Sequence, residues 1–374
     1  METSSKLRLR GLWFQVHKWV GLTLAALIIP ISLTGAALVW HHPLDEMLNP
    51  QRHGSAQPVL QPADYAAASL TLSAEGEKLL SLTYPEHGGA VLATLARPPV
   101  PGAARPVRTL LYLDPTTASL IERTSNDEGL MRVLHVLHGS LMIPGVGRTI
   151  VGWIGVAMLL SSLTGLWLWW PLKGGFRRGL RWSRQPSTSG NLHYQGGFWI
   201  ALPLAVLSLT GAWISFPAFF AQLSGDPAGP SPAERMRRMS AVPLVETQLD
   251  PTTVRSLSAN HASGPLVTIS WPTEKASAWK VSYGHEGALD EVQVDDRTGA
   301  ITPPKPRKPE TTARLMRRIH DGTGMGRLWQ TIIFIGGIVP ALLGVTGILM
   351  WLSVRRRRRL MERKRANRPE MVTA

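Results

Sequence analysis

Residues 16–40 read VHKWVGLTLAALIIPISLTGAALVW. Apart from Lys18 near its start, this run carries no formal charge. As a helix it is long enough to cross the roughly 30 Å hydrocarbon core of a bilayer. Three further runs share this character, at residues 149–171, 196–219 and 328–352. Four such runs seldom occur together as buried helices of a soluble protein. The sequence therefore predicts an α-helical membrane protein, a bundle of four transmembrane spans.

Basic residues mark one end of every span. They fall in the segments 1–15, 172–195 and 353–374, at Lys6, Arg8, Arg10, Lys173, Arg177, Arg178, Arg181, Arg184, Arg355 to Arg359, Arg363, Lys364 and Arg365. Loops rich in Lys and Arg stay on the cytoplasmic side of a membrane. We therefore expect a multi-pass protein of a bacterial inner membrane with both termini in the cytoplasm. The segments 41–148 and 220–327 would then face the periplasm.

Composition excludes several classes of function. The net charge of +15 would suggest nucleic acid in a soluble protein, but here the basic residues lie beside apolar runs, so the expected partner is the lipid bilayer and not nucleic acid. The chain has no cysteine, which excludes disulfides, thiolate metal sites, iron–sulfur clusters and covalently attached haem. We find no glycine-rich nucleotide-binding motif between a strand and a helix.

Histidines and Thr-Gly pairs recur at matching distances. Each span carries a Thr-Gly pair near the end at which the chain leaves it; the threonines are Thr34, Thr164, Thr210 and Thr346. A serine stands two residues before the threonine in the first three spans but not in the fourth. The distance from His17 to Thr34 is 17 residues, and it recurs from His193 to Thr210. The distance from His138 to Thr164 is 26 residues, and it recurs from His320 to Thr346. This pattern predicts two tandem repeats of two spans each, related by a pseudo-two-fold axis along the membrane normal.

The long connecting segments also resemble one another. Residues 81–85 (SLTYP) parallel residues 268–272 (TISWP), and a strand-and-turn pattern at 109–118 parallels one at 289–299. Short alternating runs bounded by Pro, Gly, Asn and Asp are typical of strands joined by turns. Residues 60–74 and 251–260 could each supply a helix. We expect one small α+β domain in each half of the chain.

Paired histidines in an apolar bundle indicate a cofactor held from both sides. Symmetry would place His17 and His193 at one depth near the cytoplasmic face, and His138 and His320 at one depth near the periplasmic face. Ionisable residues inside a bundle are costly and usually functional, and haem iron accepts histidine as an axial ligand. The sequence predicts two non-covalent, b-type haems per chain with these four metal ligands. Arg148 and Arg327, just after the second pair, could bind haem propionates.

Other interpretations of these residues stay open. A single histidine at a membrane interface is more often an anchor or a hydrogen-bonded core residue than a ligand. His135, His41 and His42 also lie near the expected periplasmic face and are rival ligands; His135 shares a helical face with His138. The Thr-Gly pairs could serve only close helix packing.

Two stretches resemble a known family. Residues 16–22 (VHKWVGL) followed by SLTG at 32–35, and residues 134–141 (LHVLHGSL) leading to LTGLWLWW at 163–170, are similar to the PepSY-associated transmembrane helix family. The resemblance implies an inner-membrane protein with PepSY-like modules in the periplasm. It also implies a link to iron acquisition, because the members it most resembles are dihaem ferrisiderophore reductases.

The combined prediction is a ferric-siderophore reductase that carries electrons across the membrane from an unidentified cytoplasmic or membrane donor. Ferric iron is bound tightly by hard oxygen donors, and one-electron reduction weakens that binding. Two alternatives remain. PepSY modules are associated with peptidase regulation, so the chain could be a membrane-anchored binding or regulatory module without redox activity. A small-molecule transporter would suit the two-fold repeat but not the absence of polar residues at mid-span.

Overall fold

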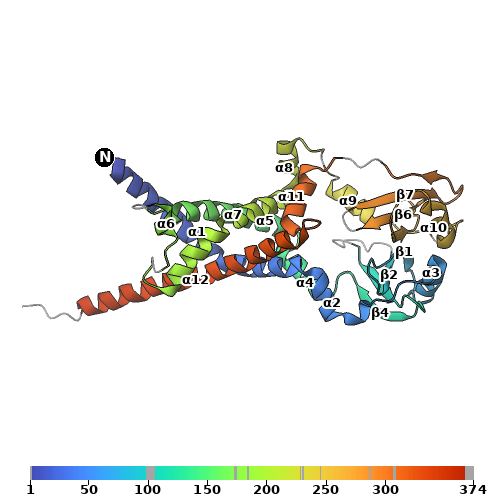
Figure 1. Ribbon diagram of the computed structural model, residues 1–374, viewed down its shortest axis with the longest axis horizontal. Helices are drawn as coiled ribbons and strands as arrows, with labels where there is room; N and C mark the ends of the chain where they lie inside the picture. Colours follow the sequence, from blue (N-terminus) through green and yellow to red (C-terminus); the bar gives the residue numbers. More distant parts are fainter. Residues whose placement is uncertain are drawn as a thin grey trace, which may run out of the picture. The chain divides into compact units, whose positions relative to one another are not determined.

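The computed structural model describes residues 2–97, 106–171, 175–182, 185–227, 229, 231–244, 246–285, 288–305 and 309–366. Lys173, Arg184 and residues 367–374 of the expected basic segments lie outside them. The chain divides into a helical unit, residues 1–40, 134–226 and 311–374, and a sheet unit, residues 41–133 and 227–310. Within the described residues, four helices are long and apolar enough to cross a membrane: α1 (Glu2–Val39), α5 (Gly147–Trp169), α7 (Thr188–Ser215) and α12 (Gly326–Ala366) (Figure 1).

The helices extend beyond or stop short of the apolar runs for local reasons. Helix α12 continues through the basic cluster Arg355 to Arg359, because arginine has a high intrinsic helix propensity. Helix α7 begins after Ser187, whose hydroxyl accepts a hydrogen bond from the Gly190 amide, as an N-cap residue does. It ends at Ser215 and not at residue 219, because Pro217 cannot continue it and instead begins α8 (Pro217–Ser224).

Large apolar side chains cover the outside of the helical unit. Trp153 is 63% exposed, Trp199 69% and Leu202 74%, and each lies on one of the four long helices. Apolar patches on this scale are not stable in water, but in a bilayer such side chains contact lipid. The four apolar helices thus indicate a multi-pass membrane protein.

Small residues let the long helices approach closely. A Cβ atom added to Gly337 of α12 would lie 2.6 Å from the carbonyl oxygen of Ser32 on α1. A Cβ atom on Gly155 of α5 would lie 3.2 Å from the carbonyl oxygen of Ser208 on α7. Close packing at small residues is a main source of helix association in membranes. It joins α1 to α12 and α5 to α7.

Two short helices precede α5 and α12. They are α4 (Leu130–Ser140) and α11 (Thr312–Asp321). The turn after α4 is so tight that a Cβ atom on Gly147 would overlap the carbonyl oxygen of Ser140. Helix α11 ends at Asp321 and is followed by Gly322, which has a φ of +81° and forms a left-handed C-cap. A further short helix of this unit is α6 (Phe176–Gly179).

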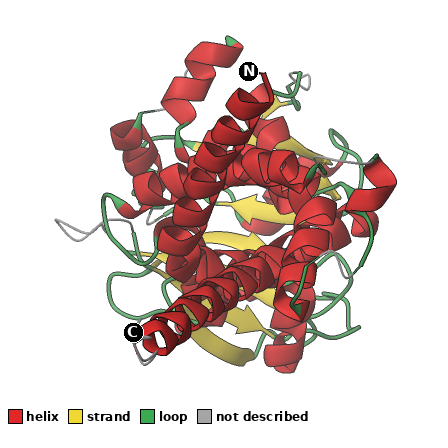
Figure 2. Ribbon diagram, turned by 90° about the vertical axis from the view of Figure 1, so that its left-hand side faces the viewer, coloured by secondary structure: helices red, strands yellow, loops and turns green. Residues whose placement is uncertain are grey.

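Among its described residues, the sheet unit contains eight antiparallel strands in the order β4-β3-β2-β1-β5-β6-β7-β8 (yellow in Figure 2). Its strands are β1 (Lys78–Thr83), β2 (Val91–Ala96), β3 (Arg108–Leu113), β4 (Leu120–Ser125), β5 (Leu266–Ser270), β6 (Ala278–His285), β7 (Ala288–Asp295) and β8 (Ile301–Thr302). Its helices are α2 (His41–Leu48), η1 (Pro50–Arg52), α3 (Pro62–Thr71), α9 (Pro232–Met239) and α10 (Pro251–Ala259). Each set of four consecutive strands is a meander, which the short turns between the strands allow.

The two connecting segments, expected as separate domains, form one continuous sheet. Strand β1 pairs with β5, so that Ser81 faces Ser270 and Thr83 faces Thr268. Each side of this seam has its own core: one around Tyr65, Leu82 and Leu111, the other around Val254, Ile269 and Trp279, together with their buried neighbours. Tyr84 and Trp271 pack against both cores. The sheet therefore couples chain segments from the two halves of the sequence.

Candidate functional site: paired histidines in the helical unit

His17 and His193 lie close together inside the bundle, with their rings edge to face. His17 projects from α1 and His193 from α7, and their ring centroids are 6.3 Å apart with an interplanar angle of 80°. The Nδ1 atom of His17 lies 3.1 Å from the carbonyl oxygen of Ser161 on α5. The Nδ1 atom of His193 lies 3.1 Å from the hydroxyl oxygen of Thr346 on α12. All four long helices thus contribute to this pair.

His138 and His320 form a second pair, carried by the short helices. Their ring centroids are 6.0 Å apart, with an interplanar angle of 41°. Nδ1 of His138 lies 2.9 Å from the carbonyl oxygen of Ile31 on α1, and Nδ1 of His320 lies 3.1 Å from that of Leu207 on α7. Along α1, His17 and Ile31 are 14 residues apart. At 1.5 Å per residue the two pairs are separated by about 21 Å along that helix.

Each histidine ring packs on the glycine of a Thr-Gly pair. A Cβ atom on Gly35 would lie 2.6 Å from Cε1 of His138. The corresponding distances to Cε1 are 3.0 Å for Gly165 and His17, 3.1 Å for Gly211 and His320, and 3.6 Å for Gly347 and His193. In every case the glycine belongs to a different helix from the histidine. The missing side chain leaves the space into which the imidazole fits.

The hydrogen bonds determine which ring nitrogen carries the proton. A carbonyl oxygen can only accept a hydrogen bond, so Nδ1 of His17, His138 and His320 must be the donor. The hydroxyl of Thr346 donates to the carbonyl of Leu342, so its oxygen is free to accept from Nδ1 of His193. In the neutral imidazole the other nitrogen, Nε2, then keeps its lone pair. Metal-binding histidines show this arrangement, with one nitrogen on the metal and the other held by a hydrogen bond.

Burial favours the neutral, metal-binding form of the second pair. Desolvation lowers the pKa of His138, an effect partly opposed by its hydrogen bond to Ile31. Desolvation, together with the neighbouring His138, lowers the pKa of His320 to about 4. Both rings are therefore uncharged near neutral pH. This suits a ligand, because a protonated imidazole cannot bind a metal.

The spacing of each pair fits one metal atom bound between two imidazoles. A bond between a metal and an imidazole nitrogen is about 2 Å long, so two such bonds and two half-rings place the ring centres about 6 Å apart. Each pair provides two nitrogens, whereas a structural metal ion takes four protein ligands. A haem brings its own equatorial nitrogens and takes axial histidines. Both pairs fit b-type haem, which needs no cysteine.

The structure places the other residues considered as ligands or cofactor contacts on several different elements. His135 is exposed on α4, one turn before His138. His41 and His42 belong to the sheet unit and lie against each other at the start of α2, with ring centroids 4.0 Å apart. The Arg148 side chain donates a hydrogen bond to the carbonyl of Ile214 near the end of α7, and Arg327 is exposed at the start of α12.

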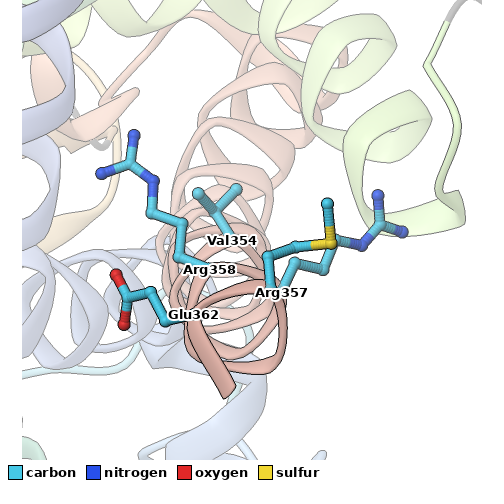
Figure 3. Close-up of a pocket in the computed structure, with 5 residues that line it drawn as sticks. Val354, Arg357, Arg358 and Glu362 are labelled. Carbon is cyan, nitrogen blue, oxygen red and sulfur yellow. The ribbon is translucent and has the colours of Figure 1, made fainter. Parts of the chain in front are cut away.

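No further centre competes with the two pairs among the described residues. No group of three or more His, Cys, Asp or Glu side chains within them could hold a metal ion. The hollow shown in Figure 3 is lined by residues of one helix, namely Val354, Arg357, Arg358, Met361 and Glu362 of α12. It contains neither a histidine nor a contact from a second helix.

Sequence reasoning missed the residues that hold the histidines. It considered close helix packing for the Thr-Gly pairs, without assigning each pair to one histidine. The carbonyl acceptors Ser161, Ile31 and Leu207 each stand three residues before the threonine of a Thr-Gly pair. That spacing recurs in the sequence, but only the fold shows which helix packs against which histidine.

Comparison with known proteins agrees with this architecture. No curated protein matches the chain. The model of the PepSY-associated TM region family matches residues 14–353. This range includes the apolar parts of the four long helices, the short helices α4 and α11, and the sheet unit. Because that match extends over most of its length, the chain belongs to the PepSY-associated TM region family, as a multi-pass membrane protein.

Proposed function

We propose that this protein binds two b-type haems and carries electrons across a bacterial inner membrane to reduce ferric siderophore in the periplasm. The observation that supports this most directly is the pair of facing histidines, found twice. Their ring centroids are 6.3 Å and 6.0 Å apart. Their Nδ1 atoms are engaged by neighbouring helices, which leaves Nε2 for a metal.

The recurrence of contacts supports a repeat in the bundle. Gly337 packs on Ser32 as Gly155 packs on Ser208. His17 docks on the Thr-Gly pair of the second span, and His193 docks on that of the fourth. In the proposed pseudo-two-fold arrangement the two halves contribute one histidine each to both pairs. One helical scaffold would thus build two similar sites at different depths.

Haem, when bound, supplies one-electron chemistry. The protein's own residues would hold it and exclude water. His17 and His193 would bind the cofactor near the cytoplasmic face, and His138 and His320 the one near the periplasmic face. Arg327 lies close in sequence to His320 and would pair with a propionate. Arg148, whose Nη2 donates to the Ile214 carbonyl, would use its other N–H groups for the same purpose.

The connections of the chain suggest where the substrate is reduced. The chain leaves α1 at Val39, forms the first half of the sheet unit and returns in α4, which carries His138. It leaves α8, forms the second half and returns in α11, which carries His320. Both sheet segments are therefore linked directly to the His138–His320 end. Ferric siderophore would be reduced at this end, since reduction weakens iron binding by hard oxygen ligands.

Two measurements on the purified protein test this function. A visible spectrum should show a Soret band and, after reduction, sharp α and β bands. Protein reduced in advance should then be mixed anaerobically with ferric siderophore, and reoxidation should keep pace with ferrous iron trapped by a chelator. A folded but colourless protein would favour the binding-module alternative. Haem that stays reduced with every ferric siderophore tried would disprove the reductase function.

A further inference from the structure

The threonines of the Thr-Gly pairs differ in whether their hydroxyl lies within hydrogen-bond distance of the neighbouring histidine. Nδ1 lies 3.1 Å from the hydroxyl oxygen of Thr346 at His193, 3.0 Å from that of Thr210 at His320, and 3.3 Å from that of Thr164 at His17. Thr34 is the exception. Its hydroxyl bonds only to the carbonyls of Pro30 and Ile31, while His138 uses the Ile31 carbonyl itself.

The threonine hydroxyls are oriented to accept from the histidines. Each donates its hydrogen to the carbonyl four residues earlier on its own helix, at distances of 2.8 Å for Thr164, 2.8 Å for Thr210 and 2.9 Å for Thr346. A hydroxyl has one hydrogen and two lone pairs. With its hydrogen engaged, each oxygen can only accept from Nδ1–H. The helix backbone thus fixes the direction of this bond.

We infer that Thr346, Thr210 and Thr164 are positioning residues that raise the basicity of the histidine Nε2 atom and thereby lower the reduction potential of the bound haem. This inference rests on the proposed haem function. When a neighbouring group accepts a hydrogen bond from the ring nitrogen that does not bind the metal, the metal-binding nitrogen becomes more basic. A more basic axial ligand stabilises the ferric form more than the ferrous form, and second-shell hydrogen bonds are among the means by which proteins set haem potentials.

The geometry predicts an order of effects. Among the described residues, the hydroxyl of Thr346 is the one hydrogen-bond acceptor for Nδ1 of His193, at 3.1 Å. The hydroxyl of Thr210 shares His320 with the carbonyl of Leu207, at 3.0 and 3.1 Å. Loss of a hydroxyl should therefore matter most at Thr346, less at Thr210 and not at Thr34. A purely structural role, bonding to the carbonyl four residues back, would affect all three alike.

The test compares Thr346→Val with Thr34→Val, since valine keeps the shape of threonine and replaces the hydroxyl by a methyl group. Potentiometric titration of the haem-loaded protein should show one potential raised in Thr346→Val and both unchanged in Thr34→Val. Thr346→Ser should restore the wild-type value. Haem affinity should fall about 10-fold in Thr346→Val, the lower end of typical second-shell effects. Equal potentials in the two valine variants, or a serine variant that behaves like valine, would overturn the inference.

A second measurement separates this inference from the haem proposal. Histidine-selective 15N NMR of the haem-free protein reports which ring nitrogen carries the proton, and His193→Gln identifies the signal. Wild-type His193 should be protonated at Nδ1, and Thr346→Val should shift that signal while Thr34→Val does not. An Nδ1 without a proton in the wild type overturns the inference. A wild-type protein that takes up no haem overturns the haem proposal and, with it, the effect on potential.

Discussion

The imidazole of His138 lies directly over Gly35 of the neighbouring helix α1. A Cβ atom on Gly35 would come within 2.6 Å of Cε1 of His138, closer than real Cβ contacts. The same relationship is looser at Gly347, where the distance to Cε1 of His193 would be 3.6 Å, an ordinary van der Waals contact. Both glycines follow a threonine in a long helix, so the two positions form a matched pair.

We predict that Gly35→Ala displaces His138, whereas Gly347→Ala leaves His193 in place. Overpacking of a tight site costs about 1–3 kcal/mol. Gly35→Ala should therefore lower the haem content at the His138–His320 pair, measured as haem per protein by pyridine haemochrome absorbance. Gly347→Ala should match the wild type. Similar haem contents in the two variants would show that the position of the His138 ring does not depend on the space left by Gly35.

Each pair of histidines is proposed to hold one haem, so replacing either member of a pair should remove the same haem. His17→Ala and His193→Ala should each lose the same haem, and His138→Ala and His320→Ala the other, because an axial site with one imidazole missing binds haem weakly. Each variant should retain about half of the wild-type Soret absorbance, as expected for independent sites. His135→Ala is the control and should retain all of it. Wild-type haem content in all four variants would make His135, His41 and His42 the candidates.

A buried carboxylate of the sheet unit predicts a dependence of local stability on pH. The side chain of Glu77 is 1% exposed and lies 2.8 Å from Arg123 and 3.1 Å from Arg97. Burial raises the pKa of Glu77, but hydrogen bonds from Thr109 and the Ala74 amide and the two arginines outweigh it, so the pKa lies below its usual value. The resulting stabilisation is present above the unfolded pKa of about 4.3 and is lost as the pH falls through the lower folded pKa.

Glu77→Gln should remove this dependence. The loss of charge at a site with partly exposed arginine partners should destabilise the fold around β1 by about 1–3 kcal/mol near neutral pH. Hydrogen–deuterium exchange of β1 and β3 amides in the whole protein measures this effect. Exchange should rise in the wild type as the pH falls below about 4, after correction for intrinsic rates, and should be high and less pH-dependent in the variant. Glu75→Gln, at an exposed neighbour, is the control.

The parts of the fold that depend on local chemistry could be predicted from the sequence. The apolar runs identify the four long helices, and Pro217 explains why α7 ends before its apolar run does. Asp114 and Asp295 accept turn amides in the same way after β3 and β7, from Thr116 and Thr298 among others. Each of these features depends only on residues that are close together in the sequence.

Long-range partners could not be predicted. The pairing of β1 with β5 joins Thr83 to Thr268, and nothing in either strand specifies the other. The equal spacing of histidines and Thr-Gly pairs indicated a repeat without assigning contacts, and the structure docks His17 on Thr164 of another helix. Which helices are neighbours depends on packing at small residues such as Gly337 and Gly155, which resemble many other glycines in the sequence.

Single introduced cysteines can test the orientation of the chain in the membrane. Because the chain has no cysteine, single cysteines can be introduced without background. Ser119→Cys and Ala276→Cys place an exposed thiol in each half of the sheet unit, and Thr188→Cys places one at the start of α7, beside the basic segment 172–195. The excess of Lys and Arg in that segment should hold it in the cytoplasm. In intact spheroplasts, a membrane-impermeant maleimide should therefore label Ser119→Cys and Ala276→Cys at once, but Thr188→Cys only after permeabilisation.

The reverse labelling pattern would show that the protein has the opposite orientation in the membrane. Labelling of only one of the two sheet positions would contradict both the even number of spans in each half and the pairing of β1 with β5, because the two halves of one sheet cannot lie on opposite sides of a membrane.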